Sequence, residues 1–181
     1  MKSPEHERRE VVTRLTEAAD MLSESMDVRF VPSMGANIAY AIKGARDGPD
    51  VAAVPGGLRV YGGRIHRSGT CAFDSGEEII RIVLTVMKFD PLMRSVAVIA
   101  YSKEFLDVLM DMFIECREVD HTRSAPGTSA MDWGIASSCS DGVPEVIYDK
   151  GTKEENGMIY LIGEDVVEVA NNIIILSHRI E

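Results

Sequence analysis

The chain has 181 residues, of which 45% are hydrophobic and 27% charged, a composition typical of a globular protein with one closed core and unlike that of a disordered or fibrous chain. Aspartate and glutamate outnumber lysine and arginine by 29 to 19, so the formal charge is -10 and the long-range field repels nucleic-acid backbones and anionic membranes. These values argue against nucleic acid and membranes as partners, whereas a few converging cations can still hold a small phosphorylated ligand.

The first segment predicts one amphipathic helix. Its apolar residues recur with a 3.6-residue period from Val11 to Leu22, and Ser3-Pro4 supplies an N-cap followed by proline at the first helical position. We assign residues 1–26 to this helix and residues 27–181 to the core of one single domain, 1–181. Short β-like runs follow, separated by glycine and proline, and Gly62-Gly63 predicts a hairpin turn after the last of them. These runs lie at 28–31, 38–42, 51–54 and 58–61.

A second helix is predicted over 75–89, because that segment is apolar on nearly every side. Its interior polar residues are spaced three, four and three apart, so they form one stripe. Two interpretations of this stripe remain open: a solvated face, or a row that turns Arg81 and Lys88 toward a phosphate. The four polar residues are Glu78, Arg81, Thr85 and Lys88.

The start of this helix matches a capping box. In that motif Ser75 accepts a hydrogen bond from the third helical amide, and Glu78 reaches back to the N-cap amide. A helix N-terminus favours anions, but Asp74, Glu77 and Glu78 crowd this one with negative charge. We therefore expect structural capping there and not anion binding.

Strands and helices alternate in the remainder, which predicts a layered α/β sheet. The predicted elements are a strand at 96–101, a helix capped by Ser102, a strand at 116–119, a polar loop at 121–130, a short helix near Trp133, strands at 146–148 and 158–162, and a final helix from about Glu164.

Two glycine-bearing segments, 54–59 and 61–64, can bring backbone amides close to a ligand, with Arg59 and Arg64 nearby. The alternative is that these glycines serve only tight turns. The four histidines are scattered without metal-ligand spacing, so we expect no metal site of the protein's own.

The three cysteines are odd in number and have no C-x-x-C spacing, and no apolar leader opens the chain. We therefore expect a cytoplasmic protein whose cysteines are small buried residues and not nucleophiles. They are Cys71, Cys116 and Cys139.

Six segments, read together and in order, resemble the archaeal ThiN family of thiamine-phosphate synthases. The similarity runs from about Val31 to Leu176. The segments are G-A-N-I-A-Y-A at 35–41, D-V-A-A-V-P-G at 50–56, R-I-V-L-T-V-M-K-F-D-P at 81–91, D-W-G at 132–134, G-V-P-E-V-I-Y-D-K-G at 142–151 and M-I-Y-L-I-G at 158–163.

The resemblance implies a three-layer αβα fold with a mixed, mostly antiparallel sheet, similar to that of class II aldolases. It also implies a reaction that joins hydroxymethylpyrimidine diphosphate to a thiazole phosphate, with release of pyrophosphate. Such chemistry needs cations or Mg²⁺ to hold the departing diphosphate. The residues that carry over as ligand-binding candidates are Asn37, Arg81, Lys88 and Asp90, with Arg59 as a substitute cation.

Two positions depart from the family pattern. An arginine usually follows V-P-G, and a histidine stands in the helix entrance F-G-x-S-x-H-x-x-R, whereas this chain has Gly57 and Glu78 there. Two hypotheses follow: a synthase, or a non-catalytic sensor that binds thiamine phosphate and acts through a regulatory partner. The resemblance also implies self-association, for which the apolar final helix offers a homodimer surface.

Overall fold

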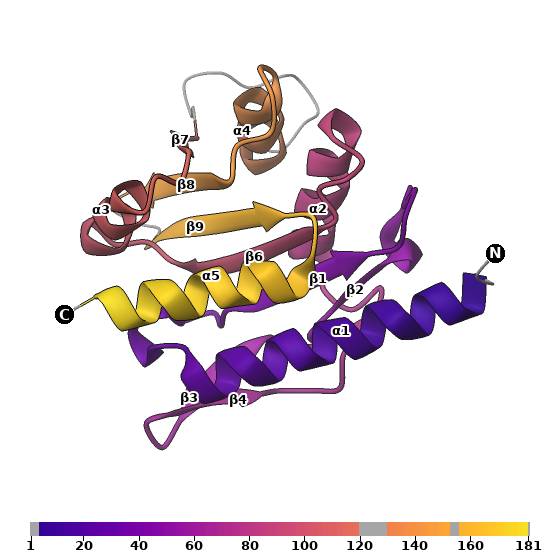
Figure 1. The fold of residues 1–181 in the computed structure, drawn as a ribbon, viewed down its shortest axis with the longest axis horizontal. Helices are drawn as coiled ribbons and strands as arrows, with labels where there is room; N and C mark the ends of the chain where they lie inside the picture. The colour runs from indigo at the N-terminus through magenta and orange to yellow at the C-terminus, as the bar shows by residue number, and fades with distance from the viewer. Residues whose placement is uncertain (1–3, 120–129, 153–155, 181) are drawn as a thin grey trace.

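The computed structural model describes residues 4–119, 130–152 and 156–180, and its centre is a seven-stranded sheet (Figure 1). In spatial order the strands are β5 (Ala72–Phe73), β2 (Val51–Ala53), β1 (Asn37–Ala41), β6 (Ser95–Ala100), β9 (Asn156–Gly163), β8 (Val146–Gly151) and β7 (Cys116–Glu118). All neighbours are antiparallel except β7 and β8, which are parallel. The predicted mixed, mostly antiparallel sheet is therefore confirmed.

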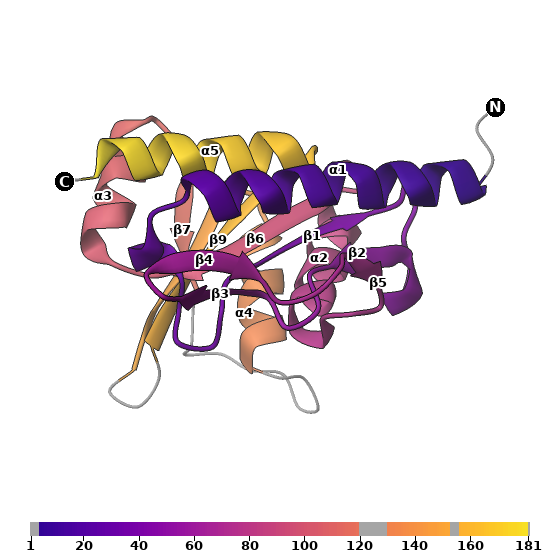
Figure 2. The same cartoon turned by 90° about the horizontal axis from the view of Figure 1, so that it is seen from below.

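Helices cover both faces of the sheet, which gives three layers (Figures 1 and 2). One face carries α1 (Pro4–Ser25), α3 (Lys103–Asp111) and α5 (Val166–Arg179), together with the hairpin of β3 (Leu58–Tyr61) and β4 (Arg64–Arg67). The other face carries α2 (Glu77–Phe89) and α4 (Ala130–Cys139). The sheet thus separates two hydrophobic cores.

The long helices form where their apolar periodicity predicts them. In α1 the side chains of Val11, Leu15, Ala18 and Leu22 are buried, and they share one face because they recur every three to four residues. Helix α2 buries six apolar residues against the sheet and α4, and its polar stripe faces outward. None of the described helices is long and apolar enough to cross a membrane.

Two local predictions are wrong. The run at 28–31 forms a 3-10 helix (Val28–Phe30) and not a strand, because the Asp27 carboxylate accepts the Arg29 amide at 2.8 Å and Phe30 turns inward against Phe105. The capping box does not form, since α2 begins after Gly76. The Ser75 hydroxyl instead donates to the Ala72 carbonyl oxygen at 2.6 Å.

The final helix uses its apolar face inside the chain. Val166, Val169, Ala170, Ile173 and Leu176 are buried against α1 and the sheet. This face of α5 is therefore covered within the chain, whereas Val167, Ile174 and Ile175 stay partly exposed, and self-association stays a prediction.

A bidentate ion pair joins the first and last helices. Arg14 Nε and Nη2 donate to the two carboxylate oxygens of Asp165 at 2.9 and 2.7 Å. Asp165 is also the N-cap of α5 and accepts the Glu168 amide. Burial alone raises the pKa of Asp165, but the hydrogen bonds from Arg14 and from backbone amides outweigh it and lower the pKa below its usual value.

We predict that Asp165→Asn, which keeps an oxygen for the cap and removes the charge, lowers the free energy of unfolding by about 1 kcal/mol at pH 7. Because the folded pKa is depressed, the contribution of the pair is complete above the unfolded value of about 4 and is lost as the pH falls through the folded pKa. Urea unfolding at pH 7, 5 and 3 measures this difference. Asp107→Asn, which removes the exposed pair with Lys103, is the control and should cost less. A cost that does not change with pH would contradict the assignment.

Candidate functional site

Three segments that are far apart in the sequence meet around the side chain of Asn37, at the start of β1. A carbon atom placed as Cβ on Gly57, in the turn after β2, would lie 3.9 Å from Asn37 Nδ2, and one on Gly76, at the start of α2, would lie 3.7 Å from it. We call Asn37, Gly57 and Gly76 the Asn37 cluster. The absence of side chains at both glycines leaves the Asn37 amide close to the first turn of α2.

The Asn37 side chain forms hydrogen bonds with backbone groups, as a neighbouring strand would. Its Nδ2 donates to the Val54 carbonyl oxygen at 3.0 Å, and its Oδ1 accepts the amides of Val54 at 3.1 Å and Ile38 at 2.8 Å. These bonds fix the turn after β2 against β1. Within the described residues one Nδ2 hydrogen stays without an acceptor, so Asn37 can both hold the turn and donate to a ligand.

Helix α2 begins without a side-chain cap. Gly76 is its N-cap residue and makes no capping bond, so the amides of the first turn have only their helical geometry to direct them. Such a terminus attracts anions through its open amides and its dipole. Glu77 and Glu78 oppose this attraction, since both are exposed in the first turn.

The structure separates the predicted ligand-binding residues of α2 and its C-terminal end into two groups. Arg81 is exposed one turn into α2, three residues after Glu78 and therefore on the same side of the helix. Lys88 and Asp90 lie at the opposite end of this 13-residue helix, about 18 to 21 Å from Gly76 by helical rise. Asp90 ends the helix there, and its carboxylate accepts the Leu92 amide at 3.0 Å. Arg81 thus shares the Asn37 cluster's end of α2, whereas Lys88 and Asp90 do not.

Arg59, the substitute cation, is tied to the neighbouring turn. Its Nε donates to the Gly56 carbonyl oxygen at 2.9 Å. The side chain lines a separate cavity of about 240 Å³. The other residues that line it are Val31, Pro32, Ser33, Val60 and Tyr61.

Tyr160 on β9 is a residue that sequence reasoning did not single out. Strand register aligns Asn37 with Val98 and Val98 with Tyr160, so all three lie on the α2 face of the sheet. Tyr160 is 1% exposed. Burial raises its pKa strongly, and the charges of Glu78 and Asp149 raise it further. The phenol therefore stays protonated, and two carboxylates from α2 and β8 approach this part of the sheet.

The cysteines and potential metal ligands add no reactive centre among the described residues. Cys71 and Cys139 are buried and Cys116 is half-buried, and all three are free thiols. Burial raises the pKa of Cys116 and of Cys139 to about 11, which suppresses the thiolate at neutral pH. The described part of the chain contains no group of three or more His, Cys, Asp or Glu side chains that could hold a metal ion.

The chain is similar to known thiamine biosynthesis proteins. Residues 14–175 match the family described as thiamine-phosphate synthase ThiN. The chain is 30% identical over 178 residues to the bifunctional thiamine biosynthesis protein ThiDN of Methanocaldococcus jannaschii, with 97% of this chain and 42% of that protein covered. It is 27% identical to the thiamine-phosphate synthase ThiN of Methanothermobacter thermautotrophicus, with 88% of each covered. The chain therefore spans less than half of the bifunctional protein.

Solved structures agree with this similarity. The crystal structure of the C-terminal domain of phosphomethylpyrimidine kinase superimposes with a TM-score of 0.86 at 27% identity, over 94% of this chain and all of that one. A sugar-phosphate aldolase from Thermotoga maritima superimposes with a TM-score of 0.54 at 13% identity, over 94% and 91% of the two chains. The second likeness concerns the fold alone, and it accords with the aldolase-like fold that the family resemblance implies.

The backbone at Gly57 opposes a side chain. Its φ is +75°, and a Cβ there would lie 2.5 Å from the Ala36 carbonyl oxygen. An arginine at this position, as in the family pattern, is therefore not accommodated without a shift of the backbone. The departure from the family pattern at Gly57 therefore involves the local backbone as well as the missing arginine side chain.

We predict that Gly57→Ala lowers the free energy of unfolding by about 3 kcal/mol, because the left-handed backbone and the carbonyl contact both penalise a Cβ. Gly62→Ala is the matched control, since Gly62 has φ +59° with nothing within 4 Å of its Cβ position. That variant should lose only the backbone part, about 1 kcal/mol. Chemical denaturation of both variants measures the difference, and equal losses would mean that the Ala36 contact is relieved at no cost.

Proposed function

This chain belongs to the ThiN family of thiamine-phosphate synthases, and on that premise we propose that it binds thiamine phosphate or its phosphorylated pyrimidine and thiazole precursors beside the Asn37 cluster. A role in thiamine biosynthesis agrees with the relatives that the chain resembles. The observation that carries the proposal is the uncapped start of α2, which meets the Asn37 amide across two glycines.

The phosphate would lie at the first turn of α2. The sequence alone predicted capping and no anion there, but the capping box does not form and the N-cap residue Gly76 makes no capping bond. The uncapped amides of this turn, the Nδ2 hydrogen of Asn37 that has no acceptor among the described residues, and the positive end of the helix all favour an anion there. Arg81, one turn further along, adds a cation on the side of Glu78. Half-buried Val98 and Met158, on the same face of the sheet, offer apolar contact to a pyrimidine ring.

In the synthase reaction the thiazole nitrogen forms a bond to the pyrimidine methylene carbon, and the bond from that carbon to the diphosphate oxygen breaks with its electrons leaving on pyrophosphate. Arg81 and the α2 amides would neutralise the leaving group. Mg²⁺, when bound with the diphosphate, would supply further neutralisation, and Glu78, one of the two carboxylates of the first turn, could hold it through one ligand. Asn37 would orient the substrate, and the packed sheet would exclude water.

Binding without turnover is the second candidate function, and the geometry at Gly57 favours it. Gly57 has no side chain that could contact a diphosphate, and Glu78 brings a negative charge close to where a diphosphate would lie. A sensor needs only affinity for the product, whereas a synthase needs added cations in the transition state. Product formation from the two precursors with Mg²⁺ would identify the synthase. Saturable binding of thiamine phosphate without turnover would identify the sensor.

The remaining features of the proposal concern context. We expect the protein to act in the cytoplasm, where its three free thiols stay reduced. Self-association would use a surface other than the buried face of α5, and a regulatory role would require a partner. Sedimentation of the purified chain with and without thiamine phosphate would test self-association.

We predict opposite effects for two charge removals at the start of α2. Arg81→Gln should weaken the affinity for thiamine phosphate about tenfold, because it removes a cation near the phosphate, and Glu78→Gln should strengthen it several-fold, because it removes a repulsive charge. Calorimetric titration at constant ionic strength measures both. Lys103→Gln on α3 and Glu168→Gln on α5 remove the same charges from other exposed helices and should change little. Equal effects of test and control variants would refute this location for the phosphate.

A further inference from the structure

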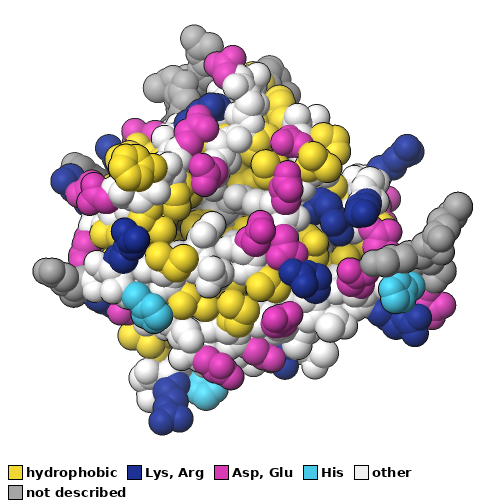
Figure 3. Space-filling view, in the orientation of Figure 1, with side chains coloured by type: hydrophobic (Ala, Val, Ile, Leu, Met, Phe, Trp, Pro, Cys, Tyr) yellow, Lys and Arg dark blue, Asp and Glu magenta, His cyan; other side chains and the backbone are white. Residues whose placement is uncertain are grey.

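A second cavity, of about 310 Å³, lies on the opposite face of the sheet from α2, where α1 crosses the ends of β1 and β6. Acidic and basic side chains are interspersed on the molecular surface that α1 and α5 form (Figure 3). The residues that line the cavity are Glu7, Glu10, Val11, Arg14, Tyr40, Lys43 and Arg94.

Arg94 is an incompletely paired cation in this cavity. Its side chain is 14% exposed. Nε donates to the Ala41 carbonyl oxygen at 3.0 Å, and the guanidinium carbon lies 4.7 Å from the centre of the Tyr40 ring. Nη2 is 4.0 Å from Glu7 Oε1, too far for a hydrogen bond. Within the described part of the chain, the terminal nitrogens of Arg94 therefore donate no hydrogen bond and have only this long contact with a carboxylate, although burial makes a weakly paired charge costly.

Two further donors of the cavity are weakly engaged. The Tyr40 hydroxyl is 3.5 Å from Asp165 Oδ1, which Arg14 already occupies, and Tyr40 is 5% exposed. Lys43 uses its backbone amide to bind Glu7 Oε1 at 2.7 Å, while its ammonium group has no partner among the residues the structure describes. By contrast, both donors of Arg14 that face Asp165 are satisfied. The unmet requirement of this cavity is thus for an acceptor with negative charge.

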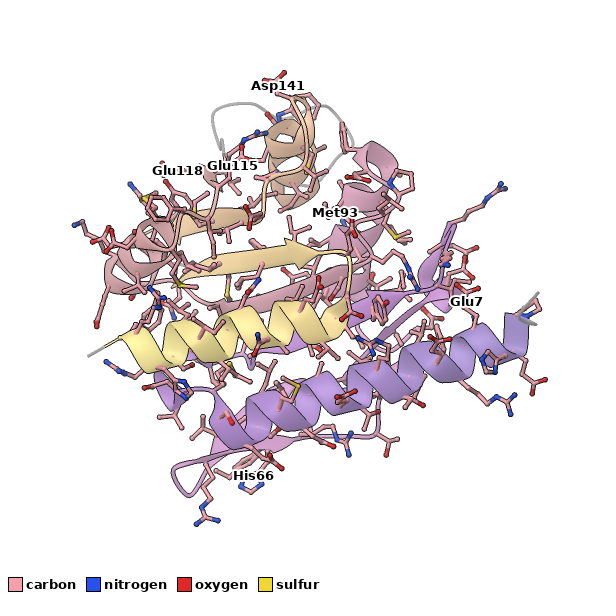
Figure 4. All side chains as sticks on the ribbon, viewed as in Figure 1. Glu7, His66, Met93, Glu115, Glu118 and Asp141 are labelled. Atoms are coloured by element: carbon pink, nitrogen blue, oxygen red, sulfur yellow. The ribbon has the colours of Figure 1, made fainter. Side chains whose placement is uncertain are left out.

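The acidic residues of α1 restrict how much charge an occupant can carry. Glu7 extends from α1 toward the strands (Figure 4), and Glu10 lines the same cavity one turn away. Their charges would repel a dianion such as a phosphate ester more strongly than a monoanion. The paired terminal nitrogens of an arginine match the two oxygens of a carboxylate. A volume of 310 Å³ is at the small end of ligand sites, so a short molecule fits best.

We propose that this cavity is a second binding site, which takes a small monocarboxylate through Arg94, Tyr40 and Lys43. The occupant would bridge α1, the segment after β1 and the start of β6, and would hold α1 against the sheet. This site is independent of the Asn37 cluster, because it lies on the other face of the sheet and on the other end of β1.

Titration of the ¹⁵N-labelled full chain with sodium propionate, at constant ionic strength, tests the proposal. Propionate should shift the Arg94 Nε–Hε and Lys43 amide resonances saturably, with a dissociation constant of about 1 to 10 mM, and should raise the melting temperature. Propionamide, the neutral isostere, should leave them in place. Lys43→Gln should weaken propionate binding about fivefold, whereas the matched control Lys103→Gln should not. Thiamine phosphate should still perturb the residues around Gly76 in both variants if the proposed function is correct.

Several results would overturn the second site. Linear, unsaturated shifts up to about 0.1 M propionate would show that no site forms. Equal shifts with propionamide would show that binding does not depend on the negative charge of the carboxylate. Tighter binding of inorganic phosphate than of propionate would exclude a monocarboxylate as the preferred ligand. Equal affinity in Lys43→Gln and the parent chain would exclude the lysine. Failure of thiamine phosphate to bind at α2 would instead count against the proposed function alone.

Discussion

The structure depends on a central sheet whose two faces must both be shielded from solvent. In β1, four consecutive residues from Ile38 to Ala41 are buried, and because side chains alternate between the two faces, neither face of the strand is exposed to solvent. Helices therefore cover both faces, and each face has a core of its own. This requirement also divides the chemistry: the Asn37 cluster belongs to the α2 side, and the cavity of Arg94 belongs to the α1 side.

Local cations act within a protein of strongly negative net charge, and their effect depends on how they are paired. Arg14 is neutralised by Asp165 and joins two helices. Arg94 is more buried than Arg14 and binds a carbonyl and an aromatic face, and its terminal nitrogens donate no hydrogen bond to the described residues. Arg81 is exposed, and it would contribute to ligand binding because it lies close to the uncapped start of α2. Pairing and position therefore decide which cations can serve a ligand, because the total charge of -10 is the same for all of them.

Glycine has a particular role at the candidate site. Gly57 takes a left-handed backbone against the Ala36 carbonyl, and Gly76 lies close to Ile79, Ala53 and the Asn37 amide. These contacts bring the turn after β2 and the start of α2 toward Asn37. Because of this contact, the backbone at Gly57 also differs from what an arginine would need, in addition to the loss of a positive charge. Function therefore cannot be inferred from the exchange of one side chain alone.

Periodicity and residue type in the sequence determined the long helices, most strands, the hairpin at Gly62-Gly63 and the family, since these depend on local burial patterns and on motifs in order. The tertiary structure decided which candidates meet: Asn37, Gly57, Glu78 and Arg81 gather at one end of α2, and Lys88 and Asp90 lie at the other. It also placed Tyr160 beside the acidic residues and left Arg94 underpaired. Such contacts depend on strand register and helix packing between segments far apart in the chain, which no local pattern encodes.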